Sequence, residues 1–139
     1  MIKELVRDEA LLSTPCEMAT AEDAELAEDL MDTLLSIEDG AGLAANQIGV
    51  TKQMFAYLDE RDNVHVMCNP KIVFGLKAFK AEEGCLTRDE YTKVTRYNKI
   101  KLQYQVIVNG ELRQRTGDFQ GWTAQVIQHM IDHCKGRLV

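Results

Sequence analysis

Two histidines near the end of the chain, His129 and His133, are placed to bind one metal ion. They lie four residues apart in a segment whose apolar residues recur with helical spacing, so their rings emerge side by side on one face of the predicted helix. Two neutral imidazoles in this arrangement can chelate a metal. The same spacing also occurs in pairs of hydrogen-bonded histidines at the edge of a core, so this pattern needs support from elsewhere in the chain.

Cys85 is the candidate third ligand. It lies in the segment EGCLT at 83–87, which is typical of neither a strand core nor a turn, and we expect an unusual backbone to hold its thiolate out. One cysteine and two histidines leave one coordination position open for water or substrate, as in catalytic sites. Cys134 is the nearest candidate for a closing fourth ligand. It points about 100° away from His133 on a helix, so we expect it in the core.

A third segment, GAGLAANQIG at 40–49, is dense in small residues. It lacks the spacing and the lysine of a phosphate-binding loop, which makes a nucleotide site a poor interpretation. Small residues allow the backbone of a ligand to approach closely, and the Gln47 amide offers a hydrogen-bond donor inside the bend. The alternative is a tight connection between a helix and a strand.

The helices and strands predicted to position these residues together indicate an α+β domain. A capped helix is indicated over 21–36 and a second helix over 121–135. Between them the pattern predicts antiparallel strands over 53–58, 64–69, 71–76 and 99–108, and a partner strand from Glu111 after the turn Asn109-Gly110. One face of the fourth strand is expected to pack inward: Ile100, Leu102, Tyr104, Val106 and Val108.

Composition and charge limit the class of protein. The chain of 139 residues has 45% hydrophobic and 27% charged residues, which is ordinary globular usage, and we expect a single domain over 1–139. A net charge of −6 without a basic block argues against direct binding to nucleic acid or to a membrane. No stretch is typical of a signal peptide or a membrane span, so we expect a cytoplasmic protein with four free thiols.

Taken in order, the segments GAGLAANQ at 40–47, EGCLT at 83–87 and QHMIDH at 128–133 resemble the three motifs of the peptide deformylases. The similarity covers nearly the whole chain, and three motifs in this order and spacing are a specific signal. That family removes the N-formyl group from the starting methionine of new proteins. The resemblance implies the deformylase fold, with an N-terminal helix, antiparallel strands in small sheets and a C-terminal metal-binding helix.

The resemblance also implies a cofactor and a way to stabilise charge. One divalent metal ion, iron(II) foremost with zinc or nickel as substitutes, would be bound by Cys85, His129 and His133. The Gln47 amide and the backbone N–H of Leu86 would stabilise the oxyanion that forms on the formyl group.

The substrate implied by the resemblance is a formyl-methionyl peptide or the N-terminus of a nascent chain. The backbone of Ala41 and Gly42, with Gly84, would hold this peptide in an extended pose. Asp132 would orient one of the metal ligands without binding the metal itself.

Met130 is the departure from the family that matters most. The family has a glutamate directly after the first histidine of its last motif, where this chain has Met130. The glutamate is the general base that takes a proton from the attacking water and passes it to the leaving amine, and a thioether can do neither. Loss of such a base lowers the rate by about a hundredfold to ten-thousandfold. Asn46, Thr87 and the pair Arg88-Asp89 also differ from the residues common in the family, which bears on substrate fit.

Three functions are compatible with this pattern. The first is a weakened or inactive relative of the deformylases that still binds metal and peptide N-termini. The second is an active deformylase that uses another base, for which Glu82, Glu83 and Asp132 are the carboxylates in motif positions. The third is a non-catalytic peptide-binding or regulatory protein, since the same fold can carry different functions.

Overall fold

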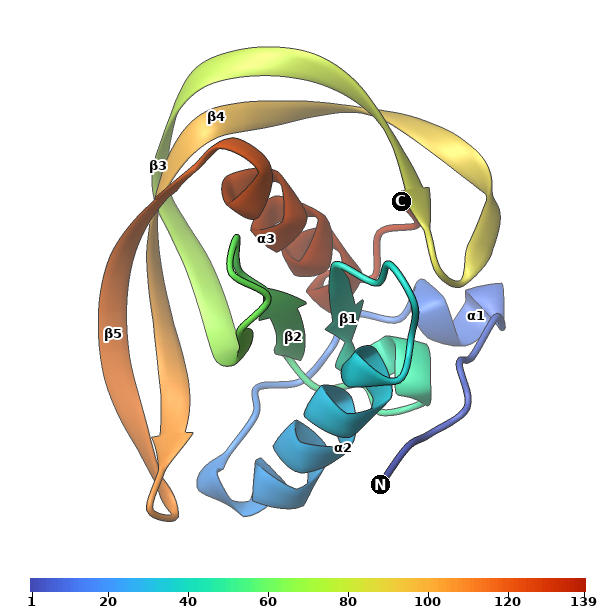
Figure 1. The fold of residues 1–139 in the computed structure, drawn as a ribbon, viewed down its shortest axis with the longest axis vertical. Coiled ribbons are helices and arrows are strands. Elements are labelled where there is room, and N and C mark those ends of the chain that lie inside the picture. Colours follow the sequence, from blue (N-terminus) through green and yellow to red (C-terminus); the bar gives the residue numbers. More distant parts are fainter.

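The computed structural model describes residues 1–139 and places helices on both faces of the first strands of one antiparallel sheet (Figure 1). The five strands pair in chain order, each with the next. The elements are α1 (Glu9–Leu12), α2 (Ala24–Leu35), β1 (Gly42–Ala44), β2 (Met54–Leu58), β3 (Val64–Cys85), β4 (Arg88–Val108), β5 (Glu111–Gln120) and α3 (Gly121–Cys134), with 3-10 turns at Ala21–Asp23 and Ala45–Ile48.

Strand β2 lies between the two long helices, and its alternating side chains explain the layers. Phe55 and Tyr57 belong to the core that α3 covers, whereas Met54 and Ala56 belong to the core that α2 covers. All four are almost fully buried. Successive side chains of a strand point to opposite faces, so a strand that is apolar throughout needs a helix on each side. The apolar sequence of β2 therefore positions α2 and α3 relative to the sheet.

The first long helix begins as the sequence predicts. The Asp23 carboxylate accepts a hydrogen bond from the backbone N–H of Thr20 at 2.8 Å, and the Thr20 hydroxyl accepts one from Glu22 at 3.3 Å. This capping box satisfies backbone donors that a helix start leaves unpaired. The first turn is a 3-10 turn and the α-helix follows it to Leu35. Neither this helix nor α3 is long and apolar enough to span a membrane.

The middle strands are longer than the sequence predicts. The ranges 64–69 and 71–76, predicted as two strands, are parts of the single strand β3. They are joined across a bulge. The register with β4 shifts between Cys68 and Lys71. Within this bulge Asn69 has a φ of 50°. The α+β class is confirmed. The strands that we expected in small sheets form one continuous sheet, because the long β3–β4 ribbon bends over α3 instead of ending (Figure 1).

The predicted turn at Asn109-Gly110 is confirmed. Both residues have positive φ, 51° and 77°, and Val108 pairs with Glu111 across the turn. Two residues of left-handed backbone match the twist of a hairpin, which is why asparagine and glycine are favoured there. The turn lies at the end of the sheet that is far from α3 (Figure 1), and Val108 is accordingly exposed.

The inward face of β4 leads to a stability prediction. Ile100 and Leu102 are 0% exposed and pack against α3, whereas Tyr104 and Val106 nearer the turn are half-buried. Leu102→Asp should lower the free energy of unfolding by at least about 3 kcal/mol, because it buries an unpaired charge. Urea denaturation followed by circular dichroism measures this change.

Gln103→Asp provides the matched control, since Gln103 is the exposed neighbour on the opposite face. It should cost less than about 1 kcal/mol. Equal stability of the Leu102→Asp variant and the wild type would mean that the faces of β4 are reversed.

Candidate metal centre

Helix α3 brings His129 and His133 together on its buried face. They lie one turn apart, so their rings stand side by side. Their Nε2 atoms are 3.1 Å apart and their ring centroids 4.9 Å apart. The two residues are 7% and 1% exposed. Both imidazoles therefore direct a nitrogen atom to the same small region.

Cys85 reaches this region from the tip of the β3–β4 ribbon. It is the last residue of β3 and pairs with Arg88 across the tip, next to a register shift that follows Glu83. Its Sγ lies 3.4 Å from His133 Nε2, and the donor atoms of Cys85, His129 and His133 all lie within 4.8 Å of one another. We expected Cys85 outside a strand. The structure places it at a strand end, and the irregular backbone is a bulge.

The chemistry of this donor set fits a divalent metal ion. Burial acts to raise the pKa of the Cys85 thiol, but interactions with His129 and His133 outweigh burial and lower the pKa to about 5. The sulfur is then a thiolate at neutral pH, which is the form that binds metal. Cys134 lies in the core that α3 shares with the sheet, and burial raises the pKa of its thiol. It is a core residue, as the sequence predicts.

Glu83 orients the first histidine. Its Oε1 atom lies 2.9 Å from His129 Nδ1, which leaves Nε2 of that ring to face the other two donors. The Arg96 guanidinium donates three hydrogen bonds of 2.6 to 3.1 Å to the Glu83 carboxylate, and the Gln125 amide donates another at 2.9 Å. Burial acts to raise the pKa of Glu83, but these hydrogen bonds outweigh it and lower the pKa to about 2. The carboxylate is therefore held in its charged form.

Asp132 lies one step farther from the histidines than we expected. Its carboxylate accepts hydrogen bonds from Arg96 at 2.7 Å and from Arg137 at 3.2 Å, and not from a histidine ring. The residue that contacts a histidine ligand is Glu83, and Asp132 is connected to it only through Arg96. No sequence signal singles out Arg96, because its position depends on how β4 pairs with β3 and how α3 crosses them.

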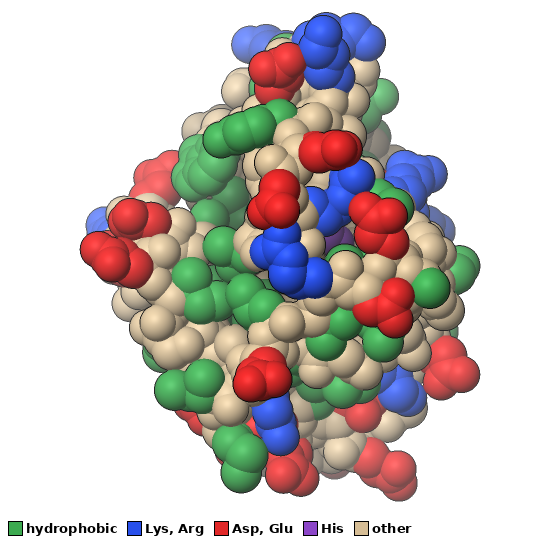
Figure 2. All heavy atoms as spheres, turned by 90° about the vertical axis from the view of Figure 1, so that its right-hand side faces the viewer, with side chains coloured by type: hydrophobic (Ala, Val, Ile, Leu, Met, Phe, Trp, Pro, Cys, Tyr) green, Lys and Arg blue, Asp and Glu red, His purple; other side chains and the backbone are tan.

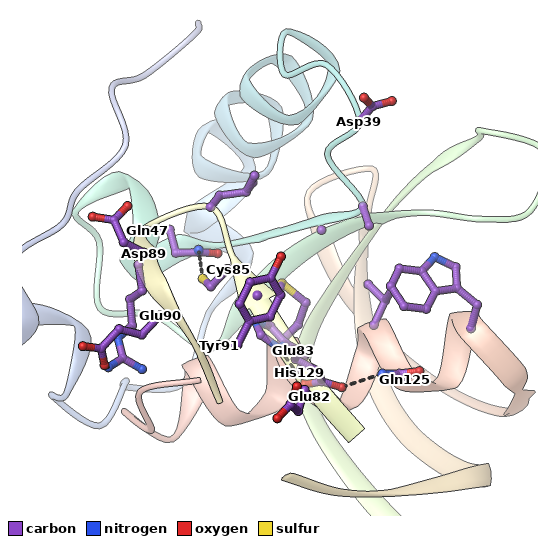
Figure 3. Close-up of a pocket in the computed structure, with 18 residues that line it drawn as sticks. Asp39, Gln47, Glu82, Glu83, Cys85, Asp89, Glu90, Tyr91, Gln125 and His129 are labelled. Carbon is purple, nitrogen blue, oxygen red and sulfur yellow. Dashed lines mark hydrogen bonds and ion pairs between the residues drawn. The ribbon is translucent and has the colours of Figure 1, made fainter. Parts of the chain in front are cut away.

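Gln47 faces Cys85 from the turn that follows β1. Its Nε2 atom donates hydrogen bonds of 3.2 Å to Cys85 Sγ and to the Thr87 hydroxyl, as Figure 3 shows for the sulfur. Its Oε1 atom accepts a hydrogen bond from the backbone of Ala44 at 2.9 Å. The last contact sets which way the amide points, so the donor end of Gln47 is turned toward the predicted ligands.

An open cavity of about 680 Å³ leads to these side chains. This volume is in the range of sites for small ligands. Figure 2 shows a histidine at the bottom of a hollow between acidic and basic side chains. Tyr91, which lies over the site in Figure 3, and Trp122 form an aromatic rim that the sequence did not predict. The residues predicted to bind substrate or stabilise charge all line the cavity: Ala41, Gly42, Gln47, Gly84 and Leu86.

Met130 forms one wall of the same cavity. A Cβ added at Gly42 would lie 3.1 Å from Met130 Sδ and 3.1 Å from Val126 Cγ1, so glycine favours the close approach of α3 to β1. Of the three carboxylates in motif positions, Glu83 and Asp132 are bound by Arg96. The third, Glu82, is an exposed residue 4.0 Å from Lys93.

We expect one divalent ion to bind per chain, with no contribution from Met130. Cys85→Ser or His133→Ala should abolish binding because each removes one of the three donors. Cys16→Ser is the control, since it changes a buried thiol outside the donor set. Loading with cobalt(II) under anaerobic conditions, followed by metal analysis, measures the occupancy. A wild type that holds no ion, or a Cys85→Ser variant that still holds one, would contradict the assignment.

The ion pair between Arg96 and Glu83, the carboxylate that contacts His129, leads to a second prediction about metal binding. Arg96→Met should weaken zinc binding about tenfold to a hundredfold, the usual effect of removing a group that supports a ligand. A competition titration with a chromophoric chelator measures it, and Arg113→Met, at an exposed arginine on β5, is the control.

Because Arg96→Met removes the buried cation that Glu83 and Asp132 share, circular dichroism must show that the variant folds. Gln125→Leu removes a single neutral donor to Glu83 and should produce a smaller loss of affinity in a stable fold. Unchanged affinity in both folded variants would show that Glu83 holds His129 without support.

Comparisons with known proteins agree with this geometry. The family model described as polypeptide deformylase matches residues 3–139. A peptide deformylase of Clostridium beijerinckii is 36% identical over 140 residues, which cover 100% of both chains. Peptide deformylase 2 of Vibrio cholerae is 39% identical over 116 residues, which cover 81% of this chain and 67% of that protein. The crystal structure of peptide deformylase from Thermus thermophilus matches with a TM-score of 0.85 and 31% identity over 99% of this chain and 84% of that one. The chain belongs to the polypeptide deformylase family.

Proposed function

We propose that this protein binds a metal ion and formylated peptide N-termini in the deformylase cavity and has greatly reduced or no deformylase activity. The observation that carries the proposal is Met130. It occupies the position of the family's catalytic glutamate, on a cavity wall next to His129. A thioether neither accepts nor donates a proton near neutral pH, so it cannot act as a general base.

The remaining residues support binding and charge stabilisation. A Cys-His-His donor set suits iron(II), zinc and nickel alike, and the resemblance to the family favours iron(II) in the cell. When bound, it supplies Lewis-acid activation of the formyl carbonyl and of water. The Gln47 amide and the Leu86 N–H line the cavity and donate hydrogen bonds to the oxygen that gains charge.

Strand β1 is the place where the peptide binds. It pairs only with β2, so its other edge is open. A peptide in extended conformation can add to such an edge through backbone hydrogen bonds. The open edge begins beside Ala41 and Gly42, and Gly84 lines the same cavity from the end of β3. The peptide therefore lies between Ala41-Gly42 and Gly84, where the side chains are small or absent.

An active deformylase with another base is the second candidate. It is favoured by carboxylates that line the cavity outside the Arg96 network, among them Glu82 and Glu90. Both are exposed, and Glu90 is 3.7 Å from Arg88. A relative named peptide deformylase also aligns over the full length of this chain. In this candidate Glu82 or Glu90 would have to move inward to serve as the base.

Substitution of Met130 separates the two candidates. Met130→Glu keeps the length and the helix preference of the side chain and should raise the turnover of a formyl-methionyl peptide by about a hundredfold, the usual contribution of a general base. Met130→Gln is the matched control, because it has the same length and cannot take up the proton. Anaerobically purified protein with measured metal content is used for all three assays.

Two outcomes contradict the proposal. Wild-type turnover equal to that of ordinary deformylases would show that another group serves as the base. No gain in a Met130→Glu variant that binds metal normally would show that the cavity has lost more than its base.

A further inference from the structure

The methionine at position 130 brings a thioether sulfur to the cavity wall, and methionine sulfur binds soft metal ions. We propose that Met130 is a fourth donor which, together with Cys85, His129 and His133, closes the site around copper(I). The proposal rests on the Cys-His-His site of the proposed function and adds a residue and an ion to it.

The position of Met130 supports this role. On α3 it directly follows His129 and precedes His133 by three residues, so its side chain is a helix-surface neighbour of the His133 side chain. It lines the same cavity as Cys85 and His129. It is also 4% exposed, so its sulfur is shielded from bulk water, as the donors of a closed site are.

The Met130 side chain lies against Gly42 on the wall of the cavity. Gly42 and Val126 enclose Met130 on the β1 side, where a Cβ at position 42 would lie 3.1 Å from Sδ. Cys85 and His129 line the same cavity as Met130. Methionine has three rotatable side-chain bonds and adapts to irregular spaces. The thioether can therefore turn toward the donors while α3 and β1 stay in place.

The chemistry of the four donors selects a soft ion. A thiolate, a thioether and two imidazoles make a set of two sulfur and two nitrogen donors, and thiolate and thioether ligands favour copper(I). The charged carboxylate closest to the histidines, Glu83, is already bound by Arg96 and His129, so it does not compete. Copper(I) enters and remains as copper(I), and the only covalent change is that any proton still on Cys85 is released to water.

Closure would distinguish copper(I) from the ions that the family uses. Three protein ligands leave a position open for substrate, whereas four fill a tetrahedral site. Zinc is bound in proteins by cysteine, histidine and carboxylate side chains, so it leaves Met130 on the wall and the cavity open to a peptide. With copper(I) the same residues form a closed site.

Met130→Leu is the variant that tests the proposal, because leucine keeps the apolar packing and removes only the sulfur. Wild type and variant are loaded with copper(I) under anaerobic conditions, and X-ray absorption at the copper edge counts the sulfur ligands. We expect two sulfur ligands in the wild type and one in Met130→Leu. Copper(I) affinity, measured against a chromophoric chelator, should fall by about tenfold, while zinc affinity stays unchanged. Met67→Leu, at a buried methionine outside the cavity, is the matched control.

One sulfur ligand in both proteins, with equal copper(I) affinity, would overturn the proposal and show that Met130 serves only to pack α3. Zinc binding would be intact in that case, so the Cys-His-His site would stand. If the wild type bound neither ion, the metal site itself would be wrong, and the proposed function would fail with it.

Discussion

The buried guanidinium of Arg96 is the interaction on which the site depends. Arg96, Glu83 and Asp132 are each less than 10% exposed, and three charges removed from water are tolerable only if they satisfy one another. Arg96 does this by bonding a carboxylate on β3 and another on α3. The strand that ends in Cys85 is thereby tied to the helix that carries the histidines. Because Glu83 also contacts His129, the same pairing that satisfies the charges orients a metal ligand.

A second constraint is the close approach of α3 to β1. Gly42 and the residues near it are small, and Met130 and Val126 pack directly against the backbone at Gly42. A Cβ at this position would lie 3.1 Å from Met130 Sδ and from Val126 Cγ1, so these side chains would have to shift. The small residues thus serve two purposes, since they bring the helix close and leave the strand edge accessible. Both purposes depend on Gly42 having no Cβ.

The site separates metal ligation from proton transfer. The three donors, the Glu83 contact and the Gln47 amide all lie around the same point, and none of them depends on Met130. Membership of the deformylase family therefore explains the scaffold, while the proposed loss of activity rests on the single side chain at position 130. Methionine is favourable here for packing as well, because it belongs to the core cluster under the sheet. In the copper(I) proposal, the buried Met130 thioether makes the choice of metal a property of this chain.

The sequence by itself determined the two helices, the hairpin turn at Asn109-Gly110 and the set of three residues, Cys85, His129 and His133, that the structure brings together. These features depend on local patterns: helical periodicity, turn chemistry and ligand spacing within one helix. It did not determine that 64–69 and 71–76 are one strand, because the bulge between them is set by pairing with β4. Nor did it show that Glu83, not Asp132, contacts a histidine, or that Arg96 is buried between them. Contacts between segments far apart in the chain leave no periodic pattern in either segment. Only the tertiary structure decides them, by the way the β3–β4 ribbon bends over α3 (Figure 1).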